Sequence, residues 1–257
     1  MAGSEWDAID LKTTEFRDYY CAFIDILGYK EKSRLFFENQ FNLFGRVQRA
    51  LDTVSFIMGL SSLATDLSEL KVRFFSDSII ITNPCKPYSL AGLLHYATTL
   101  AANLSFEDLF IRGGIARGRQ LDSLTRVGSP FLASEALQKA YSLESKLAVN
   151  PRILLDPDLA AEFGIEESAL VVNERDDYIA HFGNVLISRN GDNHKDVFSE
   201  MLDIESARDK AVDDRVRGKY QWVLDYYYWT ICSSKGFDSS KYEQFASGED
   251  RGFSRLQ

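Results

Sequence analysis

Cysteine is scarce in this chain, which has 3 cysteines, Cys21, Cys85 and Cys232, among 257 residues. An odd number of cysteines without the close spacing of metal ligands argues against both a disulfide framework and a structural zinc site. We therefore expect reduced thiols.

Long apolar runs are missing as well. No stretch approaches the roughly 18–20 consecutive apolar residues that a membrane-spanning helix needs. The opening sequence MAGSEWD has no basic segment followed by an apolar one, as a targeting signal would have. We expect a cytoplasmic protein that has no membrane partner.

Positive charge is in deficit, with 29 Lys and Arg against 38 Asp and Glu and a net charge of −9. Broad binding of nucleic acid relies on Lys and Arg to neutralise phosphates, so this balance argues against a nucleic-acid partner, although one basic pocket can still hold a nucleotide. The 45% hydrophobic and 13% aromatic content supports a sizeable core and excludes disorder as the main state.

The first half of the chain alternates predicted strands and helices. Residues 19–27 form a short apolar run interrupted by Asp25, which predicts a buried strand, and helical spacing over 35–63 predicts a long amphipathic helix. A hairpin follows over 70–82, with Asp77 in its turn. A helix over 89–104 and a strand over 110–116 complete this half.

The second half is predicted to end the sheet and continue in helices. Ser134 is the expected N-cap of a helix over 134–148. Further strands are expected at 151–155, 169–172 and 178–188, followed by a helical pattern over 194–233. The predicted organisation is a tail (1–15), an α+β sheet domain (16–190), a helical C-terminal appendage (191–234) and an irregular tail (235–257).

Asp25 and Asp77 are the acids best placed for chemistry. Each is expected at the end of a strand beside a turn, where paired carboxylates can hold hard divalent cations such as Mg²⁺ or Mn²⁺ for phosphoryl transfer. Taken singly, Asp77 can be a turn residue and Asp25 a helix-capping residue. The pair favours the metal interpretation, because an Asp inside a strand must otherwise be desolvated without an evident partner.

The segment FIDILGY at 23–29 resembles the first strand of class III nucleotidyl cyclase catalytic domains, and Asp77 matches the acid of their hairpin. The resemblance implies a ferredoxin-like βαββαβ core and two divalent ions, Mn²⁺ or Mg²⁺. It implies that Asp25, Asp77 and the Ile26 carbonyl bind metal and that the substrate-binding residues include Phe23 and the turn formed by Leu27, Gly28, Tyr29 and Lys30. Backbone amides at such a turn suit anions, and Lys30 and Arg34 can add positive charge.

Further segments resemble the bacterial pyrimidine cyclases of antiphage defence, over about residues 17–228: FSDS at 75–78, IRGGIARG at 111–118, AYSLE at 140–144, PRILL at 151–155 and RVRGKYQWV at 215–223. This resemblance implies a uridylate or cytidylate cyclase that makes a cyclic pyrimidine nucleotide for a separate effector. It also implies a homodimer with composite active sites. The alternatives are a purine cyclase, which would share both acids, and a catalytically silent cyclase-like module that senses nucleotide.

Two departures from the purine cyclases are informative. Arg73 stands where those enzymes carry a base-reading Lys, and its fork of donors suits the carbonyl oxygens of uracil, although Arg73 can equally be an exposed strand residue. Gln138 and Ser142 stand where an Asn and the transition-state Arg are expected. Ser142 cannot stabilise the transition state as an Arg would, so Arg112, Arg117 or Arg119 is the candidate replacement.

Two other groups of residues are given no catalytic role. His95, His181 and His194 occur singly, outside any nucleophile motif. Arg215, Arg217 and Lys219 are a possible phosphate patch, but acids stand beside them, so we interpret this segment as a solvated helix face.

Overall fold

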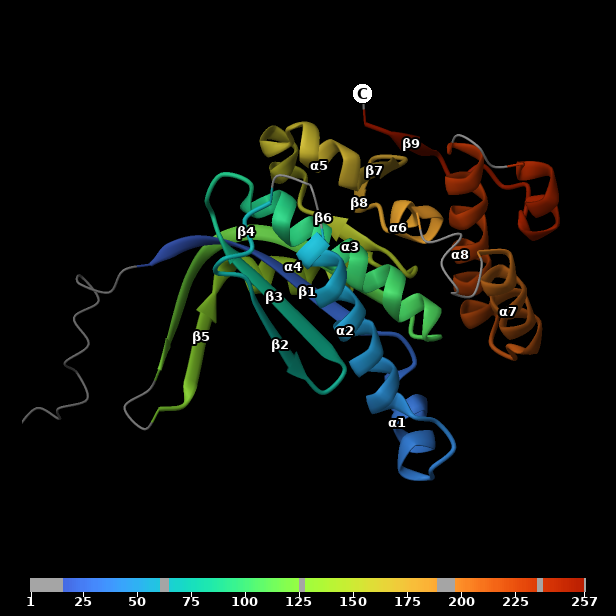
Figure 1. Cartoon of the computed structure of the whole chain (residues 1–257), viewed down its shortest axis with the longest axis horizontal. Coiled ribbons are helices and arrows are strands. Elements are labelled where there is room, and N and C mark those ends of the chain that lie inside the picture. The colour runs from blue at the N-terminus through green and yellow to red at the C-terminus, as the bar shows by residue number, and fades with distance from the viewer. Residues whose placement is uncertain (1–15, 61–64, 125–127, 189–196, 235–237, 257) are drawn as a thin grey trace, which may run out of the picture.

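The computed structural model describes residues 16–60, 65–124, 128–188, 197–234 and 238–256 (Figure 1). Nine strands form one mixed sheet in the order β2-β3-β1-β4-β6-β8-β7-β9, with β5 paired to β4. The strands are β1 (Arg17–Ile26), β2 (Lys71–Phe75), β3 (Ser78–Pro84), β4 (Ile111–Leu124), β5 (Pro130–Ser134), β6 (Ile153–Leu155), β7 (Val171–Glu174), β8 (Asp177–Ala180) and β9 (Phe253–Arg255).

Helices cover both faces of this sheet. They are α1 (Tyr29–Phe37), α2 (Leu43–Leu60), α3 (Ser89–Phe106), α4 (Glu135–Leu147), α5 (Ile165–Leu170), α6 (Gly183–Ser188), α7 (Val197–Lys210) and α8 (Asp214–Cys232), with the 3₁₀ helices η2 (Pro157–Glu162) and η3 (Ser239–Phe245). None of these helices is long and apolar enough to cross a bilayer.

The first four strands confirm the predicted α+β fold with a ferredoxin-like core. Along the chain, β1 is followed by α1 and α2, the β2–β3 hairpin, α3 and β4. In space the strands lie in the order β2-β3-β1-β4, and each neighbouring pair is antiparallel. Figure 1 shows β4 and β5 extending away from the helices, on the side opposite α7 and α8.

Alternation along β1 determines which side chains face the core. Ala22, Ile24 and Ile26 are buried in the main hydrophobic cluster, which also contains the apolar side of α3. Phe23 and Asp25 point to the other face and are only partly buried. This alternation places the Asp25 carboxyl group outside the apolar core.

Helix α4 lies against that other face because two glycines of β4 admit it. A Cβ atom on Gly114 would lie 2.2 Å from the Ala140 carbonyl oxygen, and one on Gly118 would lie 2.6 Å from the Ala136 amide nitrogen. The Phe23 ring also packs edge-on against Tyr141, with 5.2 Å between centroids. The predicted cap of α4 is confirmed, since the Ser134 hydroxyl accepts a hydrogen bond from the Leu137 amide at 3.0 Å.

The structure corrects two of the predicted helices. The single helix expected over 35–63 is instead α1 and α2, and Asn39 adopts a left-handed backbone conformation (φ 58°) between them. The helical pattern over 194–233 is likewise divided, because Asp213 caps the start of α8 by accepting a hydrogen bond from the Arg215 amide at 2.7 Å. His194 lies outside the described residues.

The expected strand over 178–188 is also shorter than predicted. It ends at Ala180, and α6 begins at Gly183, where a Cβ atom would lie 2.5 Å from the Thr230 hydroxyl of α8. Close contact with α8, which the local sequence pattern does not reveal, therefore accompanies the end of this strand.

The prediction of an irregular tail over 235–257 is wrong for its described residues. They form η3, whose Phe245 is fully buried, and β9, which pairs antiparallel with β7. Trp222 of α8 is buried too, and its indole donates a hydrogen bond to Glu174 at 2.7 Å. The C-terminal helices and β9 therefore share one hydrophobic core with the sheet.

Candidate active site

Asp25 and Asp77 lie together where β1 meets the β2–β3 hairpin. Asp25 pairs with Ser78 across β1 and β3, and the Ile26 amide donates a hydrogen bond to the Asp77 carbonyl at 3.0 Å. Burial is the main cause of the raised pKa of Asp25, and the negative charge of Asp77 raises it further, against the opposing effect of Arg112. Strand β1 and the turn of the β2–β3 hairpin thus bring the carboxyl groups of Asp25 and Asp77 close enough to affect each other's charge.

Arg112 of β4 is the cation that faces these acids. Its Nε donates a hydrogen bond to Asp25 Oδ2 at 3.2 Å, and its Nη2 lies 2.7 Å from Oε1 of Glu144 on α4. The Glu144 side chain is only 4% exposed. Burial raises the pKa of Glu144, while Arg112 lowers it. Of the three predicted replacement cations, Arg112 is the one that the structure places beside Asp25.

Sequence reasoning missed the role of Glu144. The signal available was an acid one helical turn after Ala140, on the side of α4 that approaches β4. Recognising its partner required the pairing of Asp25 with Arg112 across β1 and β4, which only the fold supplies.

The donor set at this site fits a divalent cation. Two carboxylates near each other repel when both are charged, and a hard cation with oxygen ligands relieves that repulsion. Within the described residues no group of three or more His, Cys, Asp or Glu side chains is arranged to hold a metal. A cation between Asp25 and Asp77 would therefore need water and substrate oxygens in its remaining positions, as Mg²⁺ commonly does.

The turn after β1 offers backbone amides to an anion. Gly28 has a left-handed conformation (φ 72°) and precedes α1, so the first N–H groups of the helix point out of its N-terminus. The Leu27 amide is used within the fold, because it donates to the Phe110 carbonyl at 2.8 Å. The amides of Gly28, Tyr29 and Lys30 donate no hydrogen bond to another described residue, and so remain for a phosphate.

The side chains near this turn differ in their availability. Lys30 is exposed, whereas Arg34 is paired with Glu31 and Glu38 at 2.6 Å each, and so contributes little to an anion site. Lys32 donates a hydrogen bond to the Asp108 carbonyl at 2.8 Å.

Arg73 lies on β2, on the same face of the sheet as Asp25. Cross-strand pairing links Arg73 to Ile80 and Ile80 to Phe23, so these side chains share a face. The Arg73 guanidinium donates to Asp122 of β4 at 2.6 Å and to the Thr82 hydroxyl at 3.2 Å. Asp122, which sequence reasoning did not identify, therefore holds Arg73 in place.

Gln138 and Ser142 both lie on α4. Within the described residues neither side chain forms a hydrogen bond to Asp25 or Asp77. Gln138 is exposed, and Ser142 is partly buried. Phe23, which is predicted to contact substrate, packs against Tyr141.

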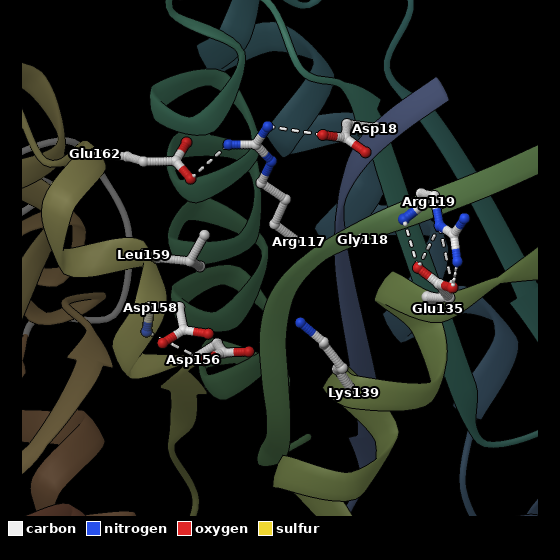
Figure 2. A pocket seen from close by; sticks show the side chains of 10 residues that line it. All are labelled: Asp18, Arg117, Gly118, Arg119, Glu135, Lys139, Asp156, Asp158, Leu159 and Glu162. Carbon is white, nitrogen blue, oxygen red and sulfur yellow. Dashed lines mark hydrogen bonds and ion pairs between the residues drawn. The ribbon is translucent and has the colours of Figure 1, made fainter. Parts of the chain in front are cut away.

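A separate cavity of about 360 Å³ opens at the opposite end of β1 and β4 (Figure 2). Its Arg117 pairs with Asp18 at 2.7 Å and with Glu162 at 3.1 Å, and its Arg119 pairs with Glu135. In the register of β1 and β4, Arg119 faces Asp18 whereas Arg112 faces Asp25. Arg117 and Arg119 are therefore neutralised by neighbouring acids and lie away from the Asp25 end.

Comparison with known proteins gives fold-level likenesses only. No protein-family model matches the sequence, and no curated protein does. Among solved structures, the chain is similar to the adenylyl cyclase CyaB from P. aeruginosa, with a TM-score of 0.44, 13% identity, and coverage of 65% of this chain and 95% of that chain.

Two further structures are similar at the same level. The guanylate cyclase domain of RhGC from Catenaria anguillulae in complex with GTP has a TM-score of 0.44 and 13% identity, covering 64% of this chain and 96% of that chain. The catalytic core of a rhodopsin-guanylyl cyclase with converted specificity in complex with ATPalphaS has a TM-score of 0.43 and 12% identity, with the same coverage. Likenesses this loose leave the function to be argued from the site itself.

Proposed function

We propose that this protein is a nucleotidyl cyclase that converts UTP, or alternatively CTP, to the 3′,5′-cyclic monophosphate and pyrophosphate. The observation that carries the proposal is the meeting of Asp25 and Asp77 at the end of β1, next to a helix N-terminus. This arrangement combines oxygen ligands for divalent cations with backbone donors for a polyphosphate.

The reaction is an intramolecular displacement. The ribose 3′-oxygen forms a bond to the α-phosphorus, and the bond from that phosphorus to the oxygen bridging the α- and β-phosphates breaks. Pyrophosphate is the leaving group, and the 3′-hydroxyl proton passes to water. Bound Mn²⁺ or Mg²⁺ would lower the pKa of that hydroxyl and offset the charge of the leaving pyrophosphate. Asp25, Asp77 and the Ile26 carbonyl are the groups that would hold the ions.

The remaining residues bind and orient the substrate. The amides of Gly28, Tyr29 and Lys30 donate hydrogen bonds to the phosphates at the start of α1. Arg112, anchored by Glu144, supplies positive charge beside Asp25. Arg112 thus takes the place for which Ser142 is unsuited. No protein nucleophile is needed.

Pyrimidine specificity is the finer part of the proposal, and Arg73 and Asp122 support it. Arg73 supplies donors and Asp122 supplies acceptors at one point of the sheet face that carries Asp25. Uracil presents two carbonyl oxygens and one N–H, so a donor–acceptor pair complements its edge. We extend the proposal to a homodimer with composite sites, in the cytoplasm, whose product is read by a separate effector in antiviral defence.

The test is to incubate the purified protein with ATP, GTP, CTP or UTP plus Mn²⁺ and to separate the products. Cyclic UMP or cyclic CMP is the expected product. A dominant purine product would make the protein a purine cyclase, and no product from any nucleotide would leave a silent binding module.

Asp25→Ala and Asp77→Ala should each abolish turnover while the protein stays folded, because removing one of two like charges relieves repulsion. Asp18→Ala is the matched control, since Asp18 lies in the same strand at its far end. Normal turnover by the double variant would refute the metal assignment.

A further inference from the structure

Lys219 lies in the first half of α8, on the turn of the helix that contacts the segment leading into β4. Its neighbour Tyr220 packs edge-on against Phe110, with 5.8 Å between ring centroids. The Phe110 carbonyl accepts the hydrogen bond from the Leu27 amide at 2.8 Å, and Arg112 follows two positions later. The first turns of α8 therefore run past the point where β1, β4 and α1 meet.

Lys219 differs from the other cations at the start of this helix. Arg215 pairs with Asp213 at 2.9 Å and Arg217 pairs with Asp214 at 2.5 Å, and both arginines are exposed. Lys219 is partly buried and makes no ion pair with the described residues. The interpretation of this segment as a solvated helix face holds for the two arginines but not for Lys219.

The charges around Lys219 connect it to the acid cluster. Burial is the main cause of the lowered pKa of Lys219; the positive charge of Arg112 lowers it further, and the negative charge of Asp25 opposes both. The ammonium group therefore lies in the electrostatic field of both residues without being paired to either. A partly buried cation in this position is stabilised by an anion that enters the site.

We propose that Lys219 binds the polyphosphate of the substrate, from a helix outside the ferredoxin-like core and within the same chain as Asp25. The inference rests on the proposed function, because it assigns the triphosphate a position between Arg112, Lys219 and the N-terminus of α1. The C-terminal helices would then contribute a substrate-binding residue as well as packing.

The experiment measures binding of inorganic tripolyphosphate to the full chain in the presence of Mn²⁺ by titration calorimetry. Lys219→Met keeps the length and apolar stem of the side chain and removes its charge, and it should weaken binding by about tenfold, which corresponds to ~1.4 kcal/mol. Lys219→Arg should restore most of that loss. Arg215→Met and Arg217→Met are matched controls on the same helix and should bind as the wild type does.

The outcomes separate this inference from the proposed function. Tripolyphosphate binding that depends on Lys219, in a protein that makes no cyclic nucleotide, would support the inference and reject the cyclase proposal. Cyclic nucleotide formation with equal tripolyphosphate affinity in wild type and Lys219→Met would reject the inference alone. Absence of tripolyphosphate binding by the wild type would also overturn it. A thermal unfolding scan of each variant confirms that affinities are compared between folded proteins.

Discussion

At the scale of single residues, the site depends on how one guanidinium is shared between two acids. Arg112 reaches Asp25 with Nε and Glu144 with Nη2. Asp25 is 20% exposed and Glu144 is 4% exposed, so the second contact is the better shielded from solvent. Glu144 therefore fixes the position of Arg112, and in the proposed mechanism Asp25 exchanges its contact with Arg112 for a metal ion.

Glu144→Gln tests this division of roles. Losing the ion-pair partner of Arg112 should destabilise the fold by about 1–2 kcal/mol, below the range for a fully buried pair, because Arg112 is partly exposed and burying the Glu144 charge has a cost of its own. With Arg112 left to Asp25 alone, turnover should require a higher Mn²⁺ concentration. Urea unfolding and metal titration of activity measure the two effects.

Glu135→Gln is the control for that experiment. Glu135 is also on α4 and also pairs with an arginine, but its side chain is 49% exposed. Its loss should leave the free energy of unfolding almost unchanged, because solvent screens an exposed ion pair. Equal effects of the two substitutions would contradict the positioning role of Glu144.

His181 gives the fold a specific sensitivity to acid. The ring is fully buried, and Nδ1 lies 2.7 Å from the Tyr226 hydroxyl. Burial lowers the pKa of His181 to about 3. As the pH falls below about 6.5, His181 is protonated in the unfolded chain but stays neutral in the folded chain. The contribution of neutral His181 to the free energy of unfolding is therefore complete above pH ~6.5 and is lost progressively toward pH ~3.

His181→Asn should therefore flatten the pH dependence of stability. The variant is expected to be less stable than the wild type at pH 8, because buried contacts are lost. Between pH ~6.5 and ~4.5 its free energy of unfolding should fall less steeply, by up to ~1.4 kcal/mol per pH unit. Urea unfolding at a series of pH values measures the slopes, and parallel slopes would disprove a buried neutral His181.

The two acids, and Arg112 as one of three candidate cations, could be predicted from the sequence, but the other residues of the site could not. An Asp interrupting an apolar strand and an Asp in a hairpin turn are local signals, and the structure brings both to one place. Glu144, Asp122 and Lys219 stand far along the chain from the residues that they face. Their positions follow from sheet register and helix packing, which no local pattern encodes.

At the scale of elements, the contact between α4 and β4 determines where Glu144 stands. Gly114→Ala should destabilise the protein by about 3 kcal/mol or more, because its Cβ would meet the backbone oxygen of Ala140 rather than a movable side chain. A shift of α4 would also carry Glu144 away from Arg112, so turnover should fall as well. Urea unfolding and a product assay measure these effects.

Gly218→Ala provides the comparison. Gly218 lies in α8 with open space around it, and the same substitution there should stabilise the protein by about 0.5–1 kcal/mol through helix propensity. Tolerance of alanine at position 114 would mean that α4 does not rest directly on the strand.

Longer elements with strong periodicity were predictable, and short ones set by distant contacts were not. The strand carrying Asp25, the hairpin, α3 and α4 all agree with their sequence patterns. The boundary between α1 and α2, the start of α6, and strands β5 and β9 do not stand out in the local pattern. Strand β9 has only the residues Phe253–Arg255 and exists by pairing with β7.

At the scale of the whole molecule, the proposed dimer should complete each site with residues from both subunits. Asp25 and Arg73 share one sheet face but lie on different strands, with β3 between them. A symmetric pair can place the Arg73 of one subunit against the Asp25 of the other.

Mixing inactive Asp25→Ala subunits with inactive Arg73→Ala subunits should therefore restore activity as subunits exchange. In a heterodimer one composite site carries both lesions and the other carries none. A mixture of Asp25→Ala with Asp77→Ala should stay inactive, because each site then lacks one metal ligand. A time course of product formation checks this, and an active monomer at high dilution would exclude composite sites.

The alternation of buried and partly buried residues along β1 also limits the fraction of molecules that fold with β1 in a shifted register. A slip of β1 by one residue would turn Ile24 and Ile26 to the partly buried face that carries Phe23 and Asp25, and would drive the Asp25 carboxylate into the apolar core. Partly exposing the two isoleucines and desolvating the carboxylate together cost at least about 3 kcal/mol, which restricts slipped molecules to fewer than about one in a hundred. The apolar residues of β1 thus fix the register that positions Asp25 in the site. Core substitutions that weaken this preference would lower the fraction of competent molecules while leaving the turnover of each correctly folded one unchanged.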